Sequence, residues 1–248
     1  MRNQLLYQLA RMTPAEVAAA ALWRFTLVAA ALWRRTLGSV TFIGVTGSVG
    51  KTTTKELIAA ALASRFPVVS NKASINRNLG VSSTLLRTRR RHRFCVQELA
   101  ARGPNTMDGL IRAFGPDVAV ITHIQRDHYR AFHGREAAAA EKGKLVAALP
   151  PDGLAVLNAD DPLVLAMAAR TRARVRTYGL GPEAMTRAAE IHGDWPERLH
   201  GTLLVNGRLL SFRTQLCGRH WAHAVLAAVA VAEEFGVPAE SALEVRHG

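Results

Sequence analysis

The chain has 248 residues, 49% of them apolar, which is enough to bury the core of one large α/β domain with a small appendage. Its 32 lysine and arginine residues against 19 acidic ones give a net charge of +13, which favours anionic partners such as nucleotides, phospho-sugars or lipid headgroups. An arginine-rich proteome, or a fragment lacking an acidic portion, would leave the same excess, and no basic motif interleaved with aromatic residues indicates nucleic acid. Cys95 and Cys217 stand in apolar, strand-like surroundings without metal-type spacing, which predicts two buried thiols in a cytoplasmic protein.

Residues 1–38 are expected to form a separate N-terminal segment built around an amphipathic helix. Thr13–Glu16 supplies a helix start, with threonine as N-cap, proline at the first position and glutamate at the third. Arg24 interrupts the apolar run, so we do not expect a membrane-spanning helix. Trp23 and Trp33, each followed by arginine, suit a helix that lies on a membrane surface, which would make the chain peripheral to the inner face of the membrane. The alternative, which we favour, is a helix that packs on the domain or covers a missing partner.

A glycine-rich stretch follows, Gly44–Glu56, with the sequence G-V-T-G-S-V-G-K-T-T-T-K-E. It lies between an apolar run and a helix-like segment, so backbone N–H groups of the turn and the positive end of the helix dipole converge on an anion. The generic pattern G-x-x-x-x-G-K-[ST] would need glycine at Val45, so this is a narrower variant, and it predicts nucleoside triphosphate binding. We expect Lys51 to reach the β- and γ-phosphates and the Thr52 hydroxyl to hold Mg²⁺. The expected phosphate-contact residues are Thr46, Gly47, Ser48, Val49, Gly50, Lys51, Thr52 and Thr53.

Beyond this turn, short apolar runs alternate with helix-like segments. The expected strands are 67–70, 94–99, 118–124, 154–157 and 175–178, and the expected helices are 82–87, 107–114, 135–149 and 162–169. Such alternation indicates βαβ units, with ligands bound where the strands end. Short strands then surround Asn206-Gly207, a hairpin signal, before a last helix over 220–234. We predict an α/β fold with a P-loop-type, mainly parallel sheet, helices on both faces and a small antiparallel segment near the C-terminus.

Several further segments occur in a fixed order after the glycine-rich turn. They are Asn71–Leu86, Val96–Leu99, Ile121–His128, Ala140–Leu145, Leu157–Pro162 and Gly218–Ala228. Together with the turn, these motifs resemble the Mur ligase family, nearest to its UDP-N-acetylmuramoyl-tripeptide–D-alanyl-D-alanine ligase branch. The resemblance implies that residues 39–240 are the family's central ATP-binding domain. Residues 241–248 would then be the start of a C-terminal domain that this chain lacks.

The resemblance also implies an activity. Members of the family are ATP-dependent, ADP-forming carboxylate–amine ligases that work through an acyl phosphate in cell-wall peptide precursor synthesis. The carboxylate substrate would be a UDP-linked or lipid-linked muramyl peptide, and a separate chain could supply the C-terminal domain. The alternative is a catalytically silent or truncated nucleotide-binding module that acts as a partner subunit. Lys51, Thr52 and Glu98 favour the ligase, whereas Ala224 and the missing C-terminal domain favour the silent module.

Metal-site roles carry over residue by residue. Glu98, at the end of a strand, matches the family's Mg²⁺-binding glutamate, and a simply solvated glutamate is the alternative. His128 matches the histidine near the second Mg²⁺, where a purely structural histidine is the alternative. Just before it, Thr122-His123 stands where relatives often carry asparagine, so this loop departs from the family pattern.

Lys142 matches a lysine that many family members carry as a carbamate, which is an anionic oxygen ligand. Carbamylation needs a neutral amine, hence a pKa lowered by partial burial or by nearby positive charge. Lys144 could supply that charge, although relatives often have glutamate there. An exposed helix lysine is the alternative.

Asn158 and His220 are expected on the nucleotide side of the site. Asn158 ends a strand just before Asp160-Asp161, a pair that could equally cap the helix beginning at Pro162. Near His220 the family pattern G-x-H-N-x-x-N places two asparagines close to the base. Trp221 and Ala224 replace them here, which removes two carboxamides and puts the base contacts in doubt.

Overall fold

The structure, a computed structural model, describes residues 13–125, 132 and 134–243. A nine-stranded sheet runs through this part of the chain in the order β2-β3-β1-β4-β5-β6-β7-β8-β9. Its strands are β1 (Thr41–Thr46), β2 (Val68–Ser70), β3 (Phe94–Glu98), β4 (Val118–Ile121), β5 (Leu154–Asn158), β6 (Arg174–Gly179), β7 (Thr186–His192), β8 (Arg198–Val205) and β9 (Arg208–Cys217). The helices are α2 (Pro14–Arg35), α3 (Lys51–Ala63), α4 (Asn78–Arg87), α5 (Asp108–Phe114), α7 (Arg135–Lys142), α8 (Lys144–Ala147), α9 (Pro162–Leu165), α10 (Ala222–Glu234) and α11 (Ala239–Leu243), with 3₁₀ turns at Ala166–Arg170 and Arg219–Trp221.

The sheet is parallel from β2 to β7 and antiparallel from β7 to β9, as the sequence predicts. Asn206 and Gly207 form the turn between β8 and β9, and both adopt a positive φ (51° and 78°) as a tight hairpin requires. The antiparallel strands do not stand apart from the main sheet, because β7 pairs with β6 at Tyr178 and Gly179 and so continues it.

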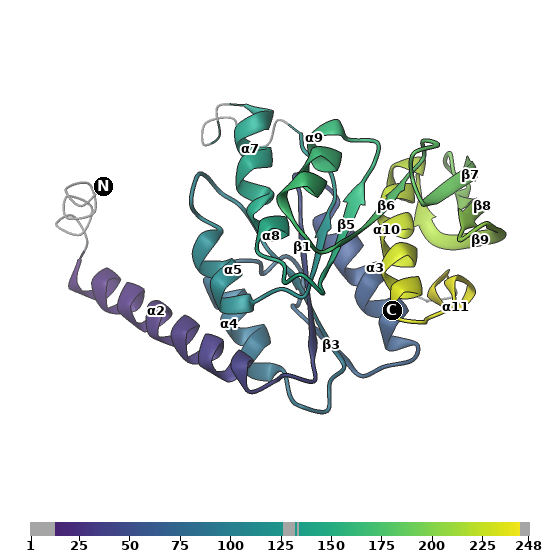
Figure 1. Ribbon diagram of the computed structural model, residues 1–248. Coiled ribbons are helices and arrows are strands. Elements are labelled where there is room, and N and C mark those ends of the chain that lie inside the picture. The colour runs from purple at the N-terminus through teal and green to yellow at the C-terminus, as the bar shows by residue number, and fades with distance from the viewer. Residues whose placement is uncertain (1–12, 126–131, 133, 244–248) are drawn as a thin grey trace.

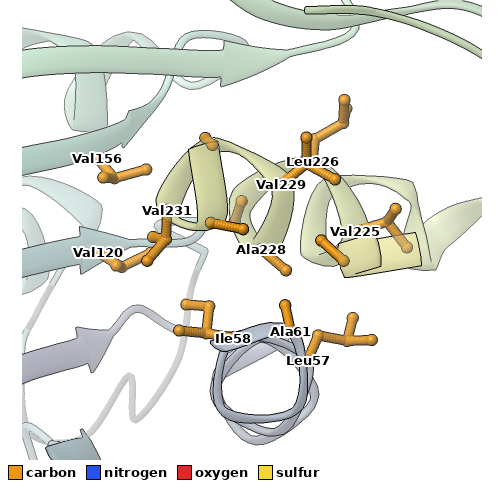
Figure 2. Close-up of a cluster of buried hydrophobic side chains, with 14 of the residues drawn as sticks. Leu57, Ile58, Ala61, Val120, Val156, Val225, Leu226, Ala228, Val229 and Val231 are labelled. Atoms are coloured by element: carbon orange, nitrogen blue, oxygen red, sulfur yellow. The ribbon is translucent and has the colours of Figure 1, made fainter. Parts of the chain in front are cut away.

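Alternating strand residues face two separate hydrophobic cores, one on each side of the sheet. In β1, Phe42 belongs to the core beneath α4, α5 and α8, whereas Ile43 and Val45 belong to the core beneath α3 and α10. The helices lie on both faces, which confirms the predicted fold class (Figure 1). Figure 2 shows α3 and α10 packed against each other and against strands β4 and β5, with small alanines at the helix contact.

The N-terminal helix α2 packs along α4 and α5 at one side of the domain (Figure 1). The indole Nε1 of Trp33 donates a hydrogen bond to the Thr88 carbonyl (3.0 Å), and the ring packs against the core. Trp33 therefore faces the domain, and the expectation that it marks a membrane-facing edge is wrong. Phe25, Val28 and Leu32 on another side of α2 are exposed. None of the helices in the described ranges has the length and hydropathy to span a bilayer.

Two local expectations need correction. Cys95 is buried as predicted, but Cys217 is only half-buried because it ends β9, the strand at the edge of the sheet. The single helix expected over 135–149 is interrupted at Gly143, which separates α7 from α8. A β-carbon on Gly143 would lie 2.5 Å from the Arg170 guanidinium, so a larger residue here would displace the end of that side chain.

Candidate functional site

The turn between β1 and α3 forms a cradle at the carboxyl end of the sheet. A β-carbon on Gly47 would lie 1.9 Å from the hydroxyl of Thr122, and Gly50 adopts a φ of +77°. The Ser48 N–H donates to the His123 carbonyl (2.6 Å), and the Thr122 hydroxyl donates to the Val49 carbonyl (2.7 Å). The segment after β4 thus holds the cradle in a fixed shape.

Side chains of the cradle are already engaged within the protein. Lys51 Nζ donates to the Ser48 carbonyl (2.9 Å), and the buried Thr46 hydroxyl donates to the Leu99 carbonyl (2.7 Å). The Thr52 hydroxyl donates to Glu98 Oε2 at 2.7 Å. Thr53 is half-buried in the first turn of α3. The structure therefore brings together the residues expected to contact phosphate, and one of them lies beside the expected metal-binding carboxylate.

Glu98 is 1% exposed, so the alternative of a solvated glutamate is wrong. Its second oxygen, Oε1, accepts a hydrogen bond from Asn76 Nδ2 (2.7 Å), and its backbone N–H donates to Asn71 Oδ1 (2.9 Å). Carboxylate and hydroxyl oxygens are hard ligands, and Mg²⁺ is commonly held by one or two protein oxygens together with phosphates and waters. Glu98 and Thr52 therefore fit Mg²⁺. No group of three or more histidine, cysteine or acidic side chains suited to a metal occurs in the described ranges.

Lys55 was not singled out from the sequence, yet it organises this region. It is fully buried on α3 and donates to the carbonyls of Asn71 (2.7 Å) and Ala73 (3.2 Å) as well as to the Glu56 carboxylate. Asn71 in turn donates to the carbonyls of Ala73 and Ile75. The loop after β2 is thereby attached to the phosphate cradle.

Lys142 is 1% exposed, which rules out the exposed-lysine alternative. Its Nζ lies 3.3 Å from Ser48 Oγ and 5.3 Å from the ring centroid of Phe132. Lys144 instead forms salt bridges with Glu141 (2.8 Å) and Asp108 (3.0 Å), and the hydrogen bond to Glu141 raises the pKa of Lys144. The charge of Lys144 is therefore compensated by these two carboxylates.

Three further predicted residues are His128, Asn158 and His220. His128 lies outside the described residues, so its role stays a prediction. Asn158 is buried, and its Oδ1 accepts the Asp160 N–H (3.0 Å), while its Nδ2 has no partner in the described part of the chain. His220 is exposed, with its ring 4.7 Å from that of Trp221. Asp161 is the N-cap of α9, which confirms the capping alternative for that residue.

One cluster was missed in the sequence. His123 follows β4 and bonds Asp161 through Nδ1 (2.9 Å), and His223 in α10 bonds Asp160 through Nε2 (2.8 Å). The two imidazole centroids are 5.5 Å apart. Burial raises the pKa of Asp161, but hydrogen bonds from His123, Ile124 and Leu163 outweigh it and leave that pKa below its ordinary value. No sequence motif relates these four residues to one another. The one available signal was His123 itself, which stands where relatives often carry asparagine.

A glycine-rich loop between a central parallel strand and the following helix, in a sheet covered on both faces, defines a P-loop-type α/β domain. The chain belongs to the Mur ligase middle domain family, whose model matches residues 45–232. The resemblance inferred from the motifs is thereby confirmed.

Individual relatives agree with this assignment. The chain is 38% identical over 203 residues to the UDP-N-acetylmuramoyl-tripeptide–D-alanyl-D-alanine ligase of Mycobacterium tuberculosis, which covers 82% of this chain and 40% of the relative. The Synechocystis enzyme of the same name is 36% identical over 200 residues, covering 80% and 42%. A crystal structure of MurF from Acinetobacter baumannii superposes with a TM-score of 0.81 at 27% identity, covering 88% of this chain and 49% of that one. The chain thus spans about two fifths of the length of the curated relatives it matches.

Proposed function

We propose that this chain is the nucleotide-binding part of an ATP-dependent, ADP-forming carboxylate–amine ligase that acts in cell-wall peptide precursor synthesis. The observation that carries the proposal is the 2.7 Å contact between Thr52, at the start of α3, and Glu98, at the end of β3. A hydroxyl and a buried carboxylate beside a glycine-rich phosphate cradle are suited to a metal-bound nucleoside triphosphate. The names of the relatives at 36–38% identity support the same reaction class.

In the proposed reaction, a substrate carboxylate oxygen attacks the γ-phosphorus, the bond to the bridging oxygen breaks, and ADP leaves with that oxygen. The amine of the second substrate then attacks the carbonyl carbon of the acyl phosphate, inorganic phosphate departs, and the amine loses a proton to give the amide. Lys51 would neutralise charge on the transferred phosphoryl group, and positioning matters more than covalent help from the protein. Bound Mg²⁺, held by Thr52 and Glu98, would add to this charge neutralisation.

His128 and Lys142 complete the proposed metal region. The support for a carbamate on Lys142 is its burial at the base of the cradle, next to Ser48, because burial disfavours the charged ammonium form. Incubation with ¹³C-bicarbonate should give a carbamate carbonyl signal in the ¹³C NMR spectrum that is absent from Lys142→Ala. Its presence in both proteins, or in neither, would remove the carbamate from the proposal.

The carboxylate substrate is assigned to the groove beside Glu98. A cavity of about 850 Å³ opens there, formed by the loop before α4 and the segment after β3. Asn76 borders both the cavity and Glu98, and Arg77 and Arg102 add positive charge to the lining. An open groove with two guanidinium groups suits an acidic peptide, so a UDP-linked or lipid-linked muramyl peptide is the proposed occupant.

The domain division is part of the proposal. Residues 39–240 would be the central ATP-binding domain, residues 1–38 a helical segment attached to it, and residues 241–248 the start of a further domain. That domain, on this polypeptide or on a separate chain, would close on the nucleotide and bring the amine substrate. Closure by such a domain would cover the proposed nucleotide site, which is open in the described residues.

Contact between α2 and the inner face of a membrane is a further part of the proposal. Phe25, Val28 and Leu32 are exposed on α2, and Arg89, Arg90 and Arg91 are exposed next to its C-terminal end. Apolar and basic groups together suit an anionic lipid surface. Vesicles with anionic lipid should co-sediment the protein, and Phe25→Ser with Leu32→Ser should reduce the bound fraction. Equal sedimentation with neutral vesicles, or none with anionic ones, contradicts the contact.

A catalytically silent nucleotide-binding module is the second candidate. Two residues favour it: Ala224 is buried in the core beneath α10, and Trp221 packs against that core. Neither side chain offers a carboxamide to a nucleotide.

Calorimetric titration of residues 1–248 with ATP and Mg²⁺ is the first test, with Lys51→Ala as the control expected to abolish binding. Glu98→Gln should remove the Mg²⁺ dependence of binding, whereas Glu190→Gln, on exposed β7, should not. Absence of ATP binding by residues 1–248 contradicts both candidates, and binding without ADP formation when the proposed closing domain is supplied favours the silent module.

A further inference from the structure

A second pair of histidines lies on the antiparallel strands, away from the cradle. His192 ends β7 and His200 lies in β8, and the strand register places the two residues directly opposite each other. Their rings are stacked, with centroids 5.3 Å apart and an interplanar angle of 26°. β7 is the fourth strand along from β1, which at about 4.8 Å per strand puts the pair roughly 20 Å from the glycine-rich turn (Figure 1). The pair is therefore separate from the proposed nucleotide site.

Both histidines face away from the core beneath α10. Their neighbours Ile191 and Leu199 belong to that core, and successive residues of a strand point to opposite faces of a sheet. His192 is exposed and His200 is half-buried. An ion in the surrounding solvent can therefore reach the pair.

A hydrogen bond fixes which nitrogen of His200 is free. Its Nδ1 lies 2.8 Å from the carbonyl oxygen of Arg198. Because a carbonyl oxygen only accepts, Nδ1 carries the proton, and in the neutral imidazole Nε2 keeps its lone pair. A backbone carbonyl that holds one ring nitrogen in this way is a usual support of metal-binding histidines.

The His192 ring has more freedom. None of the hydrogen bonds among the described residues involves it, and its side chain is exposed. The χ2 torsion of histidine is broad, and exposed side chains change rotamer rapidly, so this ring can turn a nitrogen toward an ion held by His200.

Charged neighbours on the same face act in opposite directions. Arg213 of β9 lies opposite His200, and its positive charge opposes a bound cation. Glu190, two residues before His192, adds a carboxylate on the same side of β7. The Arg198 guanidinium is engaged with a carbonyl and a thiol of β9.

We propose that His192 and His200 form a binding site for a divalent transition-metal ion that prefers imidazole, such as Zn²⁺, Ni²⁺ or Cu²⁺. Metal–nitrogen bonds of about 2.0–2.1 Å are within reach of both rings, because the β-carbons of opposite residues are about 5 Å apart. In the described ranges no group of three or more histidine, cysteine or acidic side chains is suited to a metal, so water or an external anion would complete the coordination. The bound ion would link β7 to β8.

Calorimetric titration of residues 1–248 with Zn²⁺, in excess Mg²⁺ to occupy sites of hard oxygen ligands, tests the inference. The wild type should bind one Zn²⁺ at the pair, and Cu²⁺ should bind there more tightly. His192→Ala and His200→Ala should each weaken Zn²⁺ binding at least about tenfold, since loss of an outer-shell partner alone costs that much. Arg213→Gln should tighten binding severalfold, and an unchanged affinity would place the ion elsewhere.

His223→Ala is the matched control, because it removes one ring of the other imidazole pair and should leave Zn²⁺ affinity unchanged. Circular dichroism of the metal-free variants checks that they are folded. No Zn²⁺ binding by the wild type, or unchanged affinity in either His192→Ala or His200→Ala, overturns the inference. So does weak binding of several ions that falls equally in His220→Ala, which would mean adventitious contact with surface histidines. The titration contains no nucleotide, so its result is independent of the proposed function.

Discussion

At the scale of single residues, the two thiols differ in environment. Cys95 is fully buried in β3, and burial raises the pKa of its thiol to about 12, whereas Cys217 is half-buried at the end of β9. Because the thiolate is the reactive form, a disulfide reagent at about pH 8 should modify one thiol in the folded protein and two after denaturation. Cys217→Ser should remove the reaction of the folded protein. Rapid reaction of Cys95 without denaturant would contradict the buried position of β3.

Asp161 should make stability depend on pH. Its pKa is lowered relative to the unfolded chain, so the ionised carboxylate stabilises the fold at neutral pH, and this contribution is lost as the pH falls below about 4. Asp161→Asn should lower the free energy of unfolding by about 1–2 kcal/mol at neutral pH, and by less at acidic pH. Urea unfolding at both pH values measures this, with the exposed Asp152→Asn as the control. A loss that is the same at both pH values would contradict the role of the charge.

Residue contacts were predictable only where topology brings motifs together. Thr52 lies in the helix after β1 and Glu98 ends β3, and these strands are neighbours in the parallel sheet, so the contact agrees with the strand order and the glycine-rich turn. The bond between His223 and Asp160 joins the start of α10 to the end of β5, and nothing in the sequence specifies how α10 lies over that strand. His128 remains a prediction.

At the scale of elements, the attachment of α2 depends on Arg34. Its guanidinium donates to the carbonyls of Phe114 (3.0 Å) and Gly115 (2.7 Å), bridges to Asp117, and lies over the ring of Phe42. Arg34→Ala removes the side-chain donor to both carbonyls and leaves Asp117 with the Phe42 N–H, so it should lower the free energy of unfolding by about 1–3 kcal/mol. The exposed neighbour, in Arg35→Ala, should change it by less than about 0.5 kcal/mol. Equal effects of the two substitutions in denaturant unfolding would contradict this attachment.

Helices and strands were largely predictable from local pattern. The helix start at Thr13–Glu16 agrees with the structure, and the apolar run before the glycine-rich turn forms β1, because capping residues and apolar runs act locally. The strand expected at 118–124 is present as β4 but ends at Ile121. The interruption at Gly143 was not predictable from the local pattern, since Gly143 keeps helical backbone angles (φ −63°, ψ −15°).

At the scale of the whole molecule, Arg176 connects the parallel and antiparallel parts of the sheet. It is buried in β6 and bonds Glu234 of α10 (2.9 Å), Thr186 of β7 and Asn206 of the hairpin turn. Arg176→Met should lower the free energy of unfolding by about 1–3 kcal/mol, because Glu234 Oε1, the Thr186 hydroxyl and Asn206 Oδ1 all lose the donor that Arg176 supplies. Arg174, which reaches the same Glu234 from an exposed position, offers the control Arg174→Met, expected to cost under about 1 kcal/mol. Equal losses in thermal or urea unfolding would contradict the connecting role.

The fold class was predictable from the sequence, but the joining of the parallel and antiparallel strands into one sheet was not. Alternating strands and helices indicate a parallel sheet, and Asn206-Gly207 indicates the hairpin. β7 pairs in parallel with β6, so one sheet extends to β9. This pairing depends on Arg176 and on the packing of α10, which connect residues far apart in the sequence.

Lys55 has a mechanical consequence for the whole site. Its ammonium ties α3 to the loop at Asn71 and Ala73, and Asn71 holds the backbone of Glu98. These bonds join the glycine-rich turn that we propose for the triphosphate to the groove that we propose for the acid. In the proposed reaction, the spacing between the two reacting groups would therefore be set when the chain folds, and we expect the site to select substrates by length.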